Sequence, residues 1–237
     1  KLPGDAMCGI AGIYNYKTNL AVSNSAIIDM ISVINYRGPD GDGVFTSGHT
    51  GLGHKRLTII DTSERSNQPM TSHYGPQTLC YNGEVYNFQE LRAELQSLGY
   101  QFHSRTDSEV VLNAWHCWGA DCAIRFNGMF AFAVWDKRDQ SLYLVRDRYG
   151  IKPVYWGVFN GTVLFGSEQK SILAHSAAEK DIDKQALLEY FTFQNLFTDR
   201  TLLKKISILP PATIARFELA GNGTPRTQQY WDYRFTE

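Results

Sequence analysis

Residues 7–14 read MCGIAGIY, and this short stretch decides how the rest of the chain is interpreted. The run that follows Cys8 is apolar and rich in isoleucine, which is typical of a buried strand. Gly9 and Gly12 suit a strand whose backbone comes close to a ligand or to a neighbouring strand. Cys8 itself is either an ordinary buried thiol or, once Met7 is removed, the first residue of the mature protein.

The two interpretations of Cys8 imply different chemistry. A thiol with an ordinary pKa is only a few per cent thiolate at neutral pH, so a nucleophilic cysteine needs a group that takes its proton. A free α-amino group titrates at about 7.7 to 8 and can accept that proton directly or through one water. A peptide nitrogen has no lone pair available for this task. Cys8 is therefore a candidate nucleophile in the form whose amine is free.

Composition limits the kind of ligand. The chain has 237 residues, of which 43% are hydrophobic, enough for a substantial core. The formal net charge is −1, and no block of like charge is present, so neither nucleic acid nor an anionic membrane is an expected partner. No apolar run approaches the roughly 18 residues that cross a bilayer, and no secretory signal is found, so we expect a cytoplasmic protein with a small ligand.

The four cysteines do not indicate a metal site or a disulfide scaffold. They are few for the length of the chain, and no two have the close paired spacing of zinc ribbons. Cys117 and Cys122 are accordingly predicted to be buried thiols.

The order of the predicted elements indicates an α+β fold. Short apolar strands are predicted at residues 8–14 and 52–60, and helical periodicity is found at 24–36, 88–99, 108–119 and 184–193. From residue 129 onward, four short strands separated by turn residues predict an antiparallel meander. Residues 78–87 are predicted to form two strands joined at Asn82-Gly83, and the glycine-rich stretch 36–43 a loop. Together these elements favour two layers of sheet with helices outside.

Several long motifs, in order, resemble the glutaminase domain of the asparagine synthetase family, the class II glutamine amidotransferases with an N-terminal nucleophile. Motifs of this length in the family order are far more specific than one short pattern. The matching segments are MCGIAGIY at 7–14, YRGPDGDG at 36–43, GHKRLTIID at 53–61, CYNGEVYNFQELR at 80–92, TDSEVVLNAW at 106–115, NGMFAFAVWD at 127–136 and VRDRYGIKPVYW at 145–156.

The resemblance implies a fold, an activity and a set of site residues. The fold is the four-layer αββα sandwich of N-terminal nucleophile hydrolases, with two stacked, mainly antiparallel sheets. The activity is hydrolysis of glutamine to glutamate and ammonia. Cys8 is implied as the nucleophile, and Asn82 and Gly83 as the oxyanion hole. The implied substrate-binding residues are Arg56 and Asp107, which hold the two ends of the amino acid, and Leu57, Ile59, Ile60 and Glu84, which line the pocket.

These residue types suit the chemistry. Attack on an amide carbon places negative charge on its oxygen, which an Asn side chain and a backbone N–H can stabilise together. The planar fork of Arg56 suits a carboxylate, and Asp107 suits an ammonium. Considered without the resemblance, Asn82-Gly83 is a hairpin turn, Arg56 a solvated surface charge and Asp107 a helix cap.

The resemblance also predicts the domain organisation and the partners. Residues 1–7 are interpreted as a tag remnant plus the initiator Met, or as a propeptide; residues 8–219 are the glutaminase domain, and residues 220–237 a linker toward an absent synthetase domain. ATP and Mg are expected only in that synthetase domain, so no cofactor and no metal are predicted here. The expected partners are L-glutamine and a synthetase domain or subunit that receives the ammonia, and a homodimer is left open.

Three alternatives stay open at this point. A catalytically silent module of the same fold would keep the glutamine pocket and lack the free amine. A thiol hydrolase with another substrate would need a histidine beside Cys8, for which His54, His73 and His103 are the candidates. The charged segment RDRYGIKP at 146–153 is either a structural ion-pair network or a surface that faces the partner domain.

Overall fold

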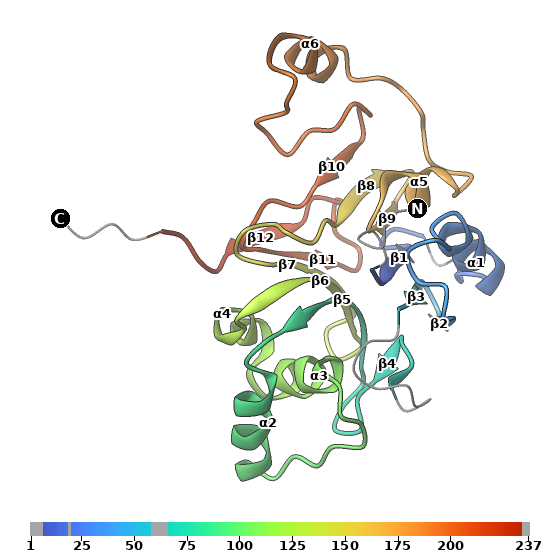
Figure 1. The fold of residues 1–237 in the computed structure, drawn as a ribbon. Helices are drawn as coiled ribbons and strands as arrows, with labels where there is room; N and C mark the ends of the chain where they lie inside the picture. Colours follow the sequence, from blue (N-terminus) through green and yellow to red (C-terminus); the bar gives the residue numbers. More distant parts are fainter. Residues whose placement is uncertain (1–6, 19, 58–65, 234–237) are drawn as a thin grey trace.

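The protein is described here by a computed structural model that covers residues 7–18, 20–57 and 66–233 (Figure 1). Its centre consists of two six-stranded antiparallel sheets. The first sheet has the order β10-β8-β9-β1-β3-β2, and its strands are β1 (Gly9–Tyr14), β2 (Gly41–Ser47), β3 (Thr50–Arg56), β8 (Tyr155–Phe159), β9 (Thr162–Gly166) and β10 (Ile206–Ile208). The second has the order β12-β11-β7-β6-β5-β4, and its strands are β4 (Met70–Thr71), β5 (Gln77–Val85), β6 (Gly128–Asp136), β7 (Ser141–Arg146), β11 (Thr213–Glu218) and β12 (Arg226–Gln229).

Helices cover the outer face of each sheet. The first sheet carries α1 (Asn24–Ser32) and α5 (Gln169–Leu173). The second carries α2 (Phe88–Ser97), α3 (Asp107–Trp118), the short 3-10 turn η2 (Gly119–Asp121) and α4 (Cys122–Arg125). The predicted four-layer αββα sandwich is confirmed. One further helix, α6 (Lys184–Phe193), lies apart from both sheets at the top of Figure 1.

The alternation of side chains along β6 shows how the layers are held together. Phe130, Phe132 and Val134 pack with the helices of the second sheet. Ala131, Ala133 and Trp135 lie in the cluster between the two sheets, with Ile10 of β1. A strand that is covered on both faces has a nearly continuous apolar sequence, as residues 129–135 of β6 do. Burying each large side chain contributes about 1.5–3 kcal/mol.

Helix ends follow local rules. The cap of α1 is Ser23, whose hydroxyl accepts the N–H of Ala26. Thr106 caps α3 in the same way. Among the described residues, no helix is long and apolar enough to cross a membrane.

The structure corrects three sequence-based predictions. The four strands predicted from residue 129 onward do not form one meander, because β6 and β7 belong to the second sheet and β8 and β9 to the first. Asn82 and Gly83 do not form a turn: β5 is one continuous strand that pairs with β6 along its whole length. The stretch 36–43 is a loop only in part, since Gly41 and Gly43 belong to β2. In these last two cases tertiary packing explains the glycine, because a Cβ would lie 2.5 Å from Met129 O at Gly83 and 2.0 Å from Gln68 O at Gly43. Residues 226–229, inside the predicted linker, form edge strand β12.

Candidate active site

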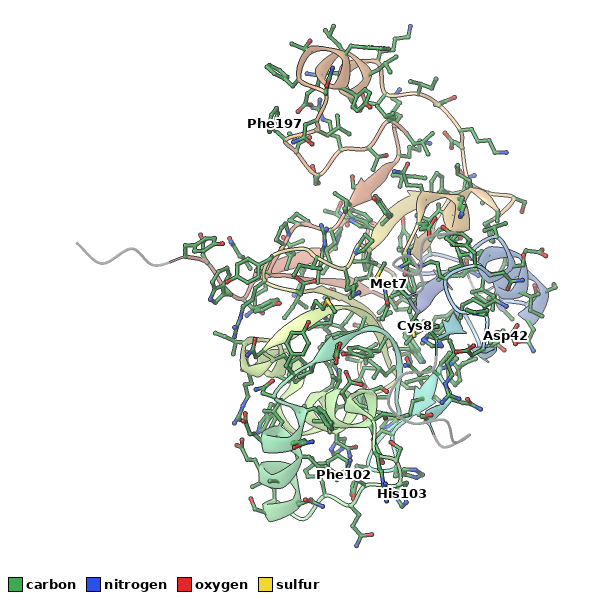
Figure 2. All side chains as sticks on the ribbon, in the orientation of Figure 1. Met7, Cys8, Asp42, Phe102, His103 and Phe197 are labelled. Carbon is green, nitrogen blue, oxygen red and sulfur yellow. The ribbon has the colours of Figure 1, made fainter. Side chains whose placement is uncertain are left out.

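Cys8 stands directly before β1, next to the end of β3. Its Sγ accepts a hydrogen bond from the backbone N–H of Leu57, with 3.4 Å between the two atoms. Arg37 holds the backbone on both sides, since its Nε donates to Cys8 O at 3.1 Å and its own carbonyl accepts the N–H of Met7 at 3.0 Å. Figure 2 shows Met7 and Cys8 side by side near the centre of the molecule. The thiol is therefore held in a defined position.

The surroundings of Cys8 keep the thiol protonated in this form of the chain. Burial raises its pKa, the hydrogen bond from Leu57 lowers it, and the charge of Asp107 raises it. Arg37 and Arg56 lower it by smaller amounts, so that the net shift is upward. A base is needed to make this thiol nucleophilic. The nitrogen of Cys8 is bonded to Met7 here and cannot be that base.

The side chain of Asn82 points to the space between the sheets, and its amide nitrogen has no described acceptor. Cys80 lies in the cluster between the sheets, so Asn82, two residues further along β5, points to the same face. Cys80 Sγ donates to Gly53 O of β3 at 3.1 Å, and Gly53 pairs with Ala11 of β1, which places β1 near this part of β5. The side chain of Asn82 is only 1% exposed, and its Nδ2 has no hydrogen-bond acceptor among the residues that the structure describes. A buried donor without an acceptor is costly, and it indicates a place for a ligand oxygen.

The backbone N–H of Gly83 points to the open edge of β5. Gly83 stands opposite Phe130 of β6. The N–H of Phe130 donates to the Asp147 carboxylate, and the carbonyl of Phe130 accepts the N–H of Asp147. Gly83 and Phe130 are therefore a non-hydrogen-bonded pair. The N–H groups of Tyr81 and Val85, on either side of Gly83, accordingly donate away from β6, to Gln68 and to Asp107. Asn82 and Gly83 thus supply two neighbouring donors, one from a side chain and one from the backbone.

Asp107 is a buried carboxylate beside these donors. Its Oδ2 accepts the hydroxyl of Tyr81 at 2.6 Å and the N–H of Val85 at 3.0 Å. Burial raises its pKa, while these hydrogen bonds oppose the rise. Thr106 is the helix cap, so the interpretation of Asp107 as a cap is wrong. The site therefore contains a buried acidic group.

Arg56 and Leu57 lie beside Cys8 at the end of β3. Arg56 ends β3, and its guanidinium donates to Asn67 Oδ1 at 2.6 Å and to the hydroxyl of Ser66. These bonds hold its side chain, and its charge acts on the Cys8 thiol. Glu84 is half-buried on β5 and interacts with the charge of Lys152. Ile59 and Ile60 lie outside the described residues.

The histidines do not form a pair with Cys8. Burial lowers the pKa of His54 to about 4, and its Nε2 lies 3.2 Å from Tyr81 O. The rings of His73 and His103 contact each other, with their centroids 4.4 Å apart. Among the described hydrogen bonds of Cys8, none involves a histidine. The thiol hydrolase alternative therefore gains no support from these residues.

Sequence reasoning missed three residues of the site: Tyr81, Arg37 and Lys152. Tyr81 bonds the Asp107 carboxylate, Arg37 bonds the backbone of Cys8, and the Lys152 ammonium contacts Met7, the residue before Cys8. All three lie in segments that carry the family resemblance, at 36–43, 80–92 and 145–156. The motifs that contain these residues were therefore visible in the sequence, but only the fold shows that the three segments meet at Cys8.

Solved structures with a similar fold define the class. Glutamine phosphoribosylpyrophosphate amidotransferase from B. subtilis aligns with a TM-score of 0.69 at 16% identity, over 94% of this chain and 49% of that one. A structure described as the allosteric regulatory enzyme of purine biosynthesis aligns with a TM-score of 0.71 at 14% identity, with the same coverage. At these identities the likeness shows the fold, which is that of the N-terminal nucleophile amidotransferases.

Sequence comparison then shows the family. Residues 7–231 match the model of the glutamine amidotransferase domain, and the chain belongs to this family. Asparagine synthetase 3 (glutamine-hydrolyzing) of Bacillus subtilis is 38% identical over 95% of this chain and 37% of its own length. Asparagine synthetase 1 of the same organism is 36% identical over 97% of this chain and 36% of its own length. The chain therefore spans little more than a third of these relatives.

Proposed function

We propose that this chain hydrolyses the side-chain amide of L-glutamine to glutamate and ammonia, with Cys8 as the N-terminal nucleophile. The main observation behind this proposal is the pair of donors at Asn82 and Gly83. The amide nitrogen of Asn82 is buried and has no acceptor among the described residues, and the backbone N–H of Gly83 beside it points away from β6. This pair matches the developing oxyanion of an amide under attack. Membership of the glutamine amidotransferase family supports the same reaction.

The two ends of glutamine are bound by opposite charges in this proposal. Arg56 receives the α-carboxylate, for which its planar fork is suited. Asp107 receives the α-ammonium, and Tyr81 keeps the aspartate in place through its 2.6 Å hydrogen bond. Leu57 and Glu84 complete the described part of the pocket wall in this proposal.

The first half of the reaction forms a thioester. The free α-amino group of Cys8 accepts the thiol proton, and the thiolate attacks the amide carbon. Asn82 Nδ2 and Gly83 N–H stabilise the negative charge on the oxygen. When the tetrahedral species collapses, the carbon–nitrogen bond breaks, and the α-ammonium returns its proton to the leaving nitrogen. Ammonia departs and the thioester remains.

The second half regenerates the thiol. The neutral α-amine accepts a proton from water as the water oxygen attacks the thioester carbon, and the same two donors stabilise the second oxyanion. The carbon–sulfur bond then breaks, the proton passes to sulfur, and glutamate leaves.

The ammonia passes to a partner in this proposal. The relatives named above are glutamine-hydrolyzing asparagine synthetases, and this chain spans about a third of their length. We infer an ATP- and Mg-dependent synthetase domain or subunit that amidates a carboxylate such as that of aspartate. This chain is expected to hold neither ATP nor metal for its own half of the reaction.

A binding module without activity is the second candidate, and one observation favours it for the form described here. The nitrogen of Cys8 is in a peptide bond with Met7, and the pKa of the thiol is raised. A form that keeps residues 1–7 is therefore expected to bind glutamine without hydrolysing it. The test is ammonia release by protein that begins at Cys8 and by its Cys8→Ala variant. Equal rates for the two proteins would overturn the proposed function.

A further inference from the structure

The segment 146–153 builds a rigid turn around one buried carboxylate. Asp147 is fully buried, and its Oδ1 accepts the N–H groups of Tyr149 and Ile151 at 3.0 Å each. Its Oδ2 accepts the N–H of Lys152 at 2.9 Å and that of Phe130 at 3.2 Å. The carboxylate is therefore occupied by backbone groups and ties the turn to β6.

Arg146 closes the other side of the turn. Its Nε donates to Lys152 O at 3.0 Å, and its Nη2 donates to Gly150 O at 2.6 Å. The segment 146–153 is thus held internally by side-chain-to-backbone hydrogen bonds. These bonds fix the backbone of Lys152 from both sides.

The side chain of Lys152 reaches from this turn to the amino side of Cys8. Lys152 is 6% exposed, and its Nζ lies 2.8 Å from Met7 Sδ. Among the described residues, this thioether is the one hydrogen-bond acceptor of the ammonium. A thioether accepts weakly, whereas an ammonium has three donors. Burying a cation with so weak an acceptor costs free energy, which suggests that the position of Lys152 beside Met7 serves a function.

Four charged or titratable groups face Lys152. They are Arg37, Cys8, Asp147 of the same turn and Glu84 of β5. Burial and Arg37 lower the pKa of Lys152, while Cys8, Asp147 and Glu84 raise it. The ammonium thus lies next to the residue before Cys8 and close enough to the nucleophile to act on it electrostatically.

We propose that Lys152 is a positioning residue for the reaction of Cys8: once Met7 is removed, its ammonium stays beside the amino end of Cys8 and keeps the α-amino group in its neutral, proton-accepting form. A like charge nearby disfavours protonation of an amine, and the same cation stabilises the thiolate that forms. The inference rests on the proposed function, since it concerns the form that begins at Cys8. Met7 occupies the acceptor position in the form described here.

The experiment compares four proteins that all begin at Cys8: the unsubstituted chain, Lys152→Met, Lys152→Arg and Lys205→Met. Lys205 is an exposed residue paired with Glu179, so its substitution removes one positive charge from another part of the molecule. Two pH profiles are recorded, kcat/KM for ammonia release from glutamine and the rate of Cys8 alkylation by iodoacetamide. Circular dichroism and thermal unfolding monitor the fold.

The charge of Lys152 predicts a specific pattern. Lys152→Met shifts the acidic limb of both profiles upward by about one pH unit, the size of effect that a neighbouring charge produces. It also slows alkylation at pH 7 several-fold. Lys152→Arg keeps the profiles near those of the unsubstituted chain, and Lys205→Met leaves them unchanged. Profiles of Lys152→Met that coincide with those of Lys205→Met would overturn the inference.

A second measurement needs no substitution at Lys152. The α-amino group of Cys8 is labelled with ¹⁵N in the unsubstituted chain and titrated by NMR. The inference predicts a pKa below the ordinary range of about 7.7 to 8.0. A value within or above that range would contradict it, even if Lys152→Met does not fold. Alkylation and NMR do not depend on turnover, so a failure of the proposed glutaminase reaction is distinguished from a failure of the role of Lys152.

Discussion

Gly83 stands opposite Phe130 in the pairing of β5 with β6, and Phe130 has both of its backbone groups bonded to Asp147. The N–H of Gly83 consequently points away from β6, next to Asn82 Nδ2, which has no acceptor among the described residues. The same Asp147 holds the turn that carries Lys152. One buried carboxylate thus helps to arrange the donors and the cation around Cys8.

The first prediction concerns the amide of Asn82. Asn82→Ala should lower kcat for ammonia release by about 100- to 1,000-fold, because it removes one of two oxyanion donors. The free energy of unfolding should change little, since Nδ2 bonds no described residue. Steady-state kinetics and urea denaturation measure the two quantities. Asn113→Ala is the matched control, since Asn113 is also buried and its Nδ2 has no partner in the described part of the chain. An equal loss of activity in both variants would contradict the oxyanion role.

The second prediction concerns the close approach of β5 and β6. Gly83→Ala should destabilise the protein by about 1–3 kcal/mol, because a Cβ at Gly83 lies 2.5 Å from Met129 O and 2.6 Å from the Cα of Phe130. Gly41→Ala is the control, since a Cβ at Gly41 meets no atom within 4 Å. Urea denaturation checks both variants. A Gly83→Ala protein as stable as the Gly41→Ala protein would show that the strands accommodate a side chain.

The third prediction concerns pH and Asp107. Because burial raises its pKa, the folded protein retains the Asp107 proton at pH values where the unfolded chain has lost it. This carboxyl therefore costs stability as the pH rises from the ordinary pKa through the raised one. Asp107→Asn should unfold at a higher temperature than the unsubstituted protein at pH 7, with the difference vanishing at about pH 3. KM for glutamine should rise at least tenfold, because the ammonium of the substrate loses its anionic partner.

Asp136 provides the control of opposite sign. Although burial raises its pKa, the hydrogen bonds from Arg138 lower it below the ordinary value. Asp136→Asn should therefore lose stability at pH 7 and leave KM unchanged. If Asp107→Asn is also less stable at pH 7, the carboxylate contributes more through its bonds to Tyr81 and Val85 than it costs by burial.

The sequence predicted the fold class and most of the helices because those features are local or carried by long motifs. The apolar runs at 129–136 and 141–147 became β6 and β7 with small shifts at their ends. Asn82-Gly83 was wrongly predicted as a turn, since the dipeptide favours one locally. The pairing with β6 decides otherwise, and this long-range contact has no local signal.

The site could be predicted only as a set of residue types. Cys8, Arg56 and Asp107 were candidates because their segments resemble a family, and the structure brings their charges into one another's field. Lys152 and Met7 are 145 positions apart in the chain, and nothing in either segment indicates their contact. The direction of the Gly83 N–H depends on the register of three strands, which sequence alone does not contain.

The central claim is that the amino group of Cys8 is the base of a glutaminase. The most direct measurement is ammonia release from glutamine by two forms of the chain, one that retains Met7 and one that begins at Cys8, with each N-terminus verified by mass spectrometry. We predict that both forms bind glutamine, and that the form beginning at Cys8 releases ammonia at least 100-fold faster, because general base catalysis on this scale requires a free amine. Equal rates in the two forms would contradict the account.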